Sequence, residues 1–76
     1  MINVKNKEFT IAFGKSLVSL RKNACLTQEE LANDADIPLS QVGRIERGEV
    51  NTTISTVYVL AKAMDLDVAE LFDFKI

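Results

Sequence analysis

Several residue types are scarce in this chain of 76 residues, and each scarcity limits the chemistry open to it. Histidine, the commonest metal ligand and a frequent general base, does not occur. The only cysteine, Cys25, has no second cysteine for a disulfide and no companion ligands for a zinc site. There is no glycine-rich phosphate loop, and no pair of carboxylates stands in a special setting. The sequence therefore predicts no enzyme, no metal site and no cofactor.

Charge and hydropathy exclude further classes of protein. The hydrophobic content of 47% is too high for a disordered chain, yet no apolar run is long enough to span a membrane. The first residues lack the apolar segment of a signal peptide, so we expect a cytoplasmic protein. The acidic excess lies in residues 49–76, with two basic and five acidic residues, against seven and six in residues 1–48. Because no strongly basic stripe occurs, non-specific affinity for nucleic acid should be modest.

Apolar residues recur three and four positions apart along the chain, which predicts an all-α fold. Asn6 and Thr53 are expected N-caps, Thr27 with Glu30 is expected to form a capping box, and Gly48 should end a helix. We expect one domain over residues 1–76 with five helices, at about 7–24, 28–34, 39–47, 54–64 and 68–73. The expected apolar positions of the fourth helix are Ile54, Val57, Tyr58, Ala61 and Met64.

Residues 27–48, TQEELANDADIPLSQVGRIERG, form the most informative stretch of the chain. Two short helical patterns flank a tight turn at Asp36, and the small residue Ala32 stands where the two helices must cross. This arrangement is typical of a helix-turn-helix, in which the second helix enters the major groove of DNA.

Three segments extend the pattern beyond the turn: LTQEELA at 26–32, IERG at 45–48 and LAKAMDLDVAELF at 60–72. In this order and spacing they resemble the Cro/C1-type helix-turn-helix domain, also called the Xre family, from about residue 10 to residue 72. Small phage repressors and restriction–modification controller proteins are similar in size. The resemblance implies a compact, five-helix, lambda-repressor-like fold with the helix-turn-helix in its second and third helices.

The resemblance further implies a homodimeric transcriptional regulator that binds double-stranded DNA, with helix 39–47 in the major groove of an inverted-repeat operator. An arginine at position 44 can donate two hydrogen bonds to guanine, although a phosphate contact or a solvated side chain is the alternative. Leu39 offers apolar contact to a thymine methyl group, or else covers the core. The family's base-reading positions, with their neighbours on the exposed side of that helix, are Leu39, Ser40, Gln41, Gly43 and Arg44.

Other matched positions concern the DNA backbone and the pose of the reading helix. Contacts to phosphate are implied at Gln28, Arg47, Asn51 and Thr52, each of which has plain surface exposure as its alternative. Arg21 and Glu46 match a pair that, in relatives, joins the first helix to the third by a salt bridge. Such a pair fixes the orientation of the reading helix more than it adds stability.

Three positions depart from the family pattern. Asp36 and Cys25 stand where glycine is usual, at turns that favour positive φ. Aspartate tolerates that conformation at some cost, and Cys25 is expected to be a half-buried packing residue rather than a redox switch. Gly43 replaces a usual polar residue, which removes one possible DNA contact and lowers the helix propensity of residues 39–47.

The apolar C-terminal residues LFDFKI predict an interface, because so small a domain can bury only some of them. The family uses this region for two-fold pairing, with the expected dimer contacts Met64, Leu66, Leu71, Phe72, Phe74 and Ile76. The alternative is that the tail folds back over its own core. Two other functions stay open, an antitoxin-type regulator whose main partner is a toxin protein, and a protein-interaction module without DNA binding. No small-molecule ligand is expected.

Overall fold

The computed structural model describes residues 4–76, and within them every regular element is helical. The order of elements is α1 (Lys7–Asn23), α2 (Gln28–Ala35), α3 (Leu39–Glu46), α4 (Ile54–Ala63) and η1 (Val68–Phe72). The all-α fold class is therefore confirmed. The expected fifth α-helix is wrong in type, because η1 is a short 3-10 helix with backbone hydrogen bonds from Glu70 to Asp67 and from Asp73 to Glu70.

The helix ends follow from capping side chains. Asn6 accepts a hydrogen bond from the Phe9 amide at the start of α1, and Thr53 accepts one from Thr56 at the start of α4. Thr27 and Glu30 form the expected capping box, with N···O distances of 3.0 and 2.9 Å. Each cap satisfies an amide that the first turn of a helix leaves without a partner.

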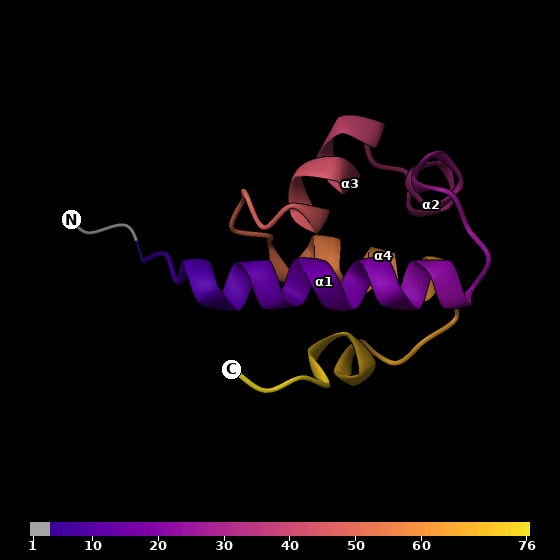
Figure 1. The fold of residues 1–76 in the computed structure, drawn as a ribbon. Helices are drawn as coiled ribbons and strands as arrows, with labels where there is room; N and C mark the ends of the chain where they lie inside the picture. The colour runs from indigo at the N-terminus through magenta and orange to yellow at the C-terminus, as the bar shows by residue number, and fades with distance from the viewer. Residues whose placement is uncertain (1–3) are drawn as a thin grey trace.

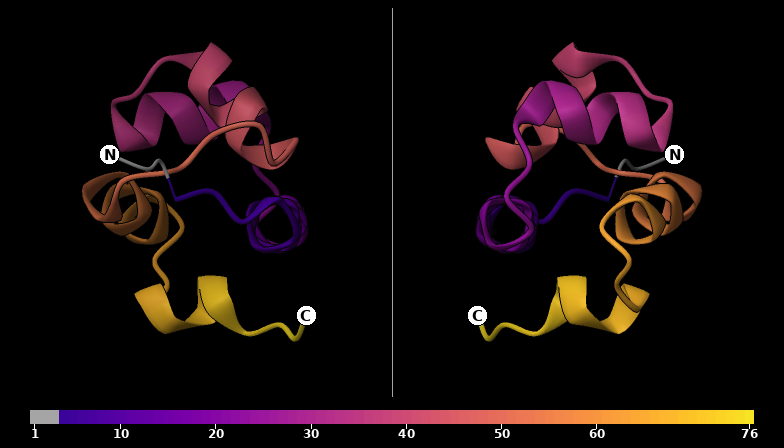
Figure 2. Two further views of the ribbon diagram at one scale, coloured as in Figure 1. Left: turned by 90° about the vertical axis from the view of Figure 1, so that its left-hand side faces the viewer. Right: turned by 90° about the vertical axis from the view of Figure 1, so that its right-hand side faces the viewer.

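The elements are arranged around α1 and α4, which lie side by side. Viewed along α1, the pair α2 and α3 lies on one side of them and η1 on the other (Figure 2). Helix α3 packs on α1, α2 packs on α4, and η1 contacts both α1 and α4. Figure 1 shows α3 raised above α1 at the edge of the molecule, in the position of a helix that can contact another molecule.

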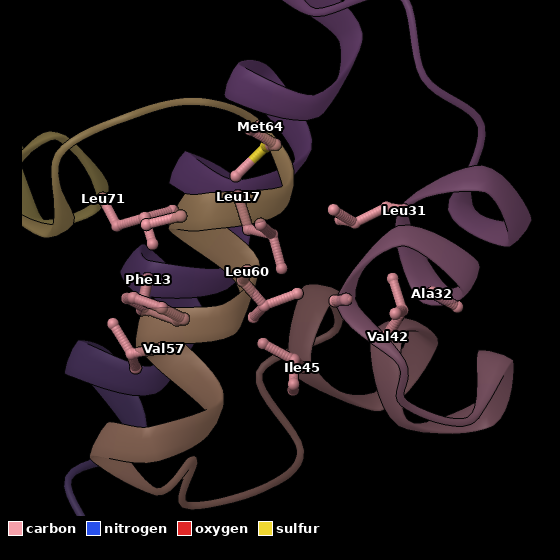
Figure 3. Close-up of a cluster of buried hydrophobic side chains, with 12 residues drawn as sticks. Phe13, Leu17, Leu31, Ala32, Val42, Ile45, Val57, Leu60, Met64 and Leu71 are labelled. Carbon is pink, nitrogen blue, oxygen red and sulfur yellow. The ribbon is translucent and has the colours of Figure 1, made fainter.

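The core joins all five elements, which fixes α3 relative to the rest of the molecule. Leu17 of α1, Val42 of α3 and Leu60 of α4 are each 0% exposed. In Figure 3, Leu60 lies between Leu17 and Ile45, and Val42 lies beside Ala32. The buried hydrophobic residues of the described part of the chain are Phe13, Leu17, Leu31, Ala32, Ala35, Val42, Ile45, Val57, Leu60, Ala61, Met64 and Leu71. The expectation that Met64 and Leu71 form a dimer contact is therefore wrong, since both belong to this core.

Among the described residues 4–76, three residues other than glycine adopt the left-handed conformation. Asp36 has φ 59° at the turn of the helix-turn-helix, and Cys25 has φ 60° between α1 and α2, as the glycine-favoured positions predicted. Asp65, after α4, has φ 58°. Cys25 is exposed, so its expected packing role is wrong. The left-handed turn at this position directs its side chain outward and leaves it no neighbours in the core.

The C-terminal tail folds back over the N-terminal half of α1. The Phe72 ring lies 5.1 Å from that of Phe13, and the Phe74 ring lies 5.3 Å from that of Phe9, measured between centroids. Phe74 is half-buried as a result, whereas Ile76 remains 61% exposed. No helix within residues 4–76 has the length and apolar character needed to cross a membrane.

Candidate nucleic-acid interface

Helix α3 has one face in the core and one in solvent. Val42 and Ile45 are buried on the side where α3 packs against α1 and α2, whereas Leu39, Ser40 and Arg44 are exposed. Leu39 retains 47% of its surface, which leaves it available for contact with another molecule. Gln41 is half-buried at the edge of this face.

Gly43 does not lie on the exposed face, and that expectation is wrong. It is buried, because the side chain of Arg47 lies over it one helical turn further on. A Cβ placed on Gly43 would stand 3.0 Å from Nη1 of Arg47. Helical periodicity alone gives the side of the helix, but not where a long neighbouring side chain lies.

A network around Glu46 fixes the orientation of α3. Arg21 donates from Nε to Glu46 Oε2 at 2.6 Å and from Nη2 to Oε1 at 3.2 Å, with 11% and 5% of the two side chains exposed. Arg21 also donates from Nη1 to the carbonyl oxygen of Leu26 at 2.8 Å. One guanidinium therefore joins α1, the α1–α2 connection and the C-terminal end of α3. Bidentate pairing of this kind restricts angles as well as distance.

Gln28, at the first position of α2, belongs to the same network. Its Nε2 donates to Glu46 Oε1 at 2.7 Å, and the side chain is part-buried. A glutamine amide carries two N–H donors, so one stays available to a ligand at the N-terminus of α2. The interaction with Glu46 thus fixes the position of the Gln28 amide.

The residues that follow α3 form a polar edge beside it. Arg47 donates to Glu49 at 2.7 Å, and both side chains are more than half exposed. The hydrogen bond from Arg47 lowers the pKa of Glu49, with smaller contributions from the charges of Arg47, Arg44 and Lys7. The same hydrogen bond and the charge of Glu49 raise the pKa of Arg47. A cluster of cations therefore surrounds one carboxylate next to the exposed face of α3.

The other two expected phosphate contacts lie further along this edge. Asn51 is exposed, and its Nδ2 donates to the carbonyl oxygen of Val4 at 3.0 Å. Thr52 is half-buried just before α4. Within residues 4–76, no group of three or more potential metal-ligating side chains is present.

Comparison with known proteins assigns this arrangement to a family. A family model described as "Helix-turn-helix" matches residues 17–71, from the middle of α1 to η1. The chain belongs to the Cro/C1-type helix-turn-helix family. This is a family of transcriptional regulators rather than a class of enzymes.

Three relatives of this helix-turn-helix protein are informative. The control protein C.SmaI of Serratia marcescens is 41% identical over 46 residues, which are 60% of this chain and 55% of that protein. The HTH-type transcriptional regulator y4dJ of Sinorhizobium fredii is 34% identical over 58 residues, 76% of this chain and 75% of its own. The crystal structure of the restriction-modification controller protein C.AhdI from Aeromonas hydrophila superimposes with a TM-score of 0.82 at 38% identity, covering 83% of this chain and 96% of that one.

The sequence did not lead us to predict the two glycines at which α1 and the helix-turn-helix pack closely together. A Cβ on Gly14 would lie 2.5 Å from the carbonyl oxygens of Ile45 and Glu46, so the backbones of α1 and α3 approach closely there. Gly48, with φ 72°, lies similarly close to Ile11. A glycine inside a helical pattern is the signal that indicates such an approach, since it otherwise lowers helix stability.

Proposed function

We propose that the protein is a sequence-specific regulator that binds double-stranded DNA by placing α3 in the major groove. One observation carries this proposal. Leu39, Ser40 and Arg44 share the exposed face of α3, while the opposite face is buried and its C-terminal end is held by Arg21 through Glu46. A short helix can read bases only if its pose is fixed, and here the core and the ion pair both restrict that pose.

The chemistry of the exposed face fits base edges. The Arg44 guanidinium can donate to O6 and N7 of one guanine, a contact that contributes roughly 1–3 kcal/mol of discrimination. Leu39 offers an apolar surface to a thymine methyl group, and the Ser40 hydroxyl can donate or accept at either kind of base. Gln41 lies at the margin of the face, and Gly43 contributes no side chain. Specificity therefore depends mainly on Arg44.

Donors to phosphate also lie outside this face. Gln28 stands at the N-terminus of α2, where the helix dipole favours an anion. Arg47, Asn51 and Thr52 follow α3 and precede α4. Contacts on the two sides of a groove fix the register of the reading helix without carrying sequence information.

We also propose that two copies pair through an apolar surface of α4 and η1. This surface, called here the α4–η1 face, consists of Ile54, Tyr58, Val68 and Phe72, which are 88%, 54%, 38% and 39% exposed. Leu66 lines the same surface as Tyr58 and Val68 and extends this face, whereas Phe74 and Ile76 line a neighbouring surface with α1. Exposed apolar residues gathered on two adjacent elements are typical of a protein interface. A two-fold pair would place two α3 helices about 34 Å apart, on an inverted repeat.

Selection from random duplex DNA tests the DNA-binding proposal directly. We expect recovery of an inverted repeat with a guanine in each half-site. The Arg44→Gln variant should lose preference at that guanine alone, whereas Arg47→Gln should lose affinity equally for all sequences. Failure to enrich any duplex would refute the proposal. Binding to a co-purified toxin protein instead would favour an antitoxin.

Sedimentation equilibrium tests the pairing proposal. Tyr58→Asp places a charge in the centre of the α4–η1 face, so we expect the dimer to dissociate. The matched control is Asn33→Asp, which adds the same charge at an exposed position of α2. An unchanged molecular mass for Tyr58→Asp, with a dimeric wild type, would locate the contact elsewhere.

A further inference from the structure

The segment that precedes α1 lies against the connection between α3 and α4. The Asn51 side chain donates to the carbonyl oxygen of Val4 at 3.0 Å, and the Thr10 hydroxyl donates to that of Gly48 at 3.1 Å. Figure 1 shows the described part of this segment rising from α1 toward the same side of the molecule as α3. The two hydrogen bonds therefore place Val4, which precedes α1, and Thr10, in the first turn of α1, beside the segment that follows α3.

A shallow polar cavity of about 320 Å³ lies where these segments meet. It is lined by Lys5, Lys7, Thr10, Gly48, Glu49, Val50 and Asn51. Both lysines are exposed. The two ion pairs formed within residues 4–76 join Arg21 to Glu46 and Arg47 to Glu49, which leaves both lysine charges without a paired carboxylate.

The one carboxylate in this cavity already occupies an environment suited to an anion. Glu49 accepts two hydrogen bonds from Arg47, at 2.7 and 3.4 Å. The charges of Arg44 and Lys7 also act on it, and the pKa of Glu49 is lowered accordingly. These cations come from α3, from its C-terminal end and from the start of α1. A phosphate that approached beside α3 would meet the same cations and would compete with Glu49 for them.

We propose that Lys5 and Lys7, with Asn51, form a second phosphate-binding site outside the helix-turn-helix. This site binds the DNA backbone next to α3, and the negative charge of Glu49 weakens that binding. The proposal rests on DNA binding as the function. It assigns a role to Lys5, before α1, and to Lys7, the first residue of α1, both of which lie outside the helix-turn-helix match that begins at residue 17. It also identifies Glu49 as a residue that weakens binding.

The expected effect has a distinct dependence on salt. Each lysine that neutralises a phosphate contributes about 0.9 to the slope of log affinity against log salt. In a dimer, Lys7→Gln should therefore lower the slope by about 1.8, and the ratio of wild-type to variant affinity should shrink about 12-fold between 50 and 200 mM salt. Lys5→Gln should behave in the same way. Because phosphates carry no sequence information, operator and scrambled duplex should lose affinity equally.

The test measures binding of the full chain to a selected duplex and to a scrambled duplex by fluorescence anisotropy over this salt range. Lys15→Gln is the matched control, since Lys15 is exposed on α1 but lines a different surface with Glu70 and Asp73. Circular dichroism establishes that each variant is folded. Glu49→Gln should raise affinity for both duplexes, and this gain should shrink when Arg47 is also replaced by glutamine.

The outcomes separate the site from the function. Smaller salt slopes for Lys5→Gln and Lys7→Gln, with a wild-type slope for Lys15→Gln, support the site. Wild-type slopes for both variants, in a protein that binds its duplex, overturn the site and leave the proposed function standing. If the wild type binds no duplex at any salt concentration, the proposed function fails, and the site fails with it.

Discussion

Replacement of Glu46 by alanine should destabilise the fold and DNA binding together. The change removes both acceptors of the Arg21 Nε and Nη2 donors, and the partner of the Gln28 amide. Arg21 is left with a charged side chain that is only 11% exposed and a single acceptor, the Leu26 carbonyl oxygen. Removal of one partner from a buried ion pair costs about 3–5 kcal/mol.

The lower end of that range is the better estimate, because Arg21 keeps one hydrogen bond and a little contact with water. A loss of about 3 kcal/mol lowers Tm by about 12–24 °C in a domain of this size. Thermal unfolding followed by circular dichroism measures the shift. The control is Glu49→Ala, which breaks the exposed pair with Arg47 and should leave Tm unchanged, because exposed pairs contribute little.

A second variant separates loss of the charge pair from loss of packing. Arg21→Met with Glu46→Leu removes both charges and should recover most of the lost Tm, since no charge remains buried without a partner. DNA affinity should stay below wild type even so, because apolar contacts do not restrict the angle of α3 as two-point pairing does. A wild-type Tm in Glu46→Ala would show that the pair does not hold α3, and the reasoning would be refuted.

Three further changes have expected outcomes that follow from the structure. Gly14→Ala should lower Tm, since its Cβ would lie 2.5 Å from backbone oxygens of Ile45 and Glu46, and such overpacking costs about 1–3 kcal/mol; an unchanged Tm would mean that α1 can shift freely. Gly43→Ala should raise Tm by about 4–8 °C for roughly 1 kcal/mol of helix propensity, because its only close neighbour is the movable end of Arg47; a lower Tm would show that the arginine cannot move. The Glu49 carboxyl pKa, followed by NMR, should lie below its ordinary value and rise toward it in Arg47→Gln. The pKa of the Glu49 carboxyl is lower in the folded protein than in the unfolded chain. The stabilisation from its pair with Arg47 is therefore present above the pKa of the unfolded chain and is lost as pH falls through the pKa of the folded protein.

The sequence predicted the features of this fold that depend on local chemistry. Caps at Asn6, Thr27 and Thr53 are visible in the sequence because each serves amides within three residues. The tight turn at Asp36 was predictable from its place between two helical patterns, and its left-handed conformation was expected through the family resemblance, which has glycine there. The Arg21–Glu46 pair spans 25 residues and was expected only through the family resemblance, because nothing in either residue's surroundings predicts the other.

The wrong predictions concern which apolar residues are buried, not which positions of a helix are apolar. Ile54 and Tyr58 fall on the apolar positions of α4 together with Val57, yet only Val57 is buried. In a domain this small, the core has room for part of each apolar stripe, and the space is assigned by packing between distant elements. The same effect buries Met64 and leaves Ile54 exposed, so residues chosen for the dimer by hydrophobicity alone were partly wrong.

The stability of α3 comes from its neighbours rather than from its own sequence. Eight residues are too few for a helix to be stable alone in water, and Gly43 lowers the propensity further. Its N-cap, Pro38, provides no side-chain hydrogen bond. Helix α3 is therefore stabilised by the burial of Val42 and Ile45 and by the network around Glu46. The pose of the exposed face of α3 is therefore determined by the two helices on which α3 packs, α1 and α2. Substitutions in α1 should alter the proposed DNA binding without changing that face.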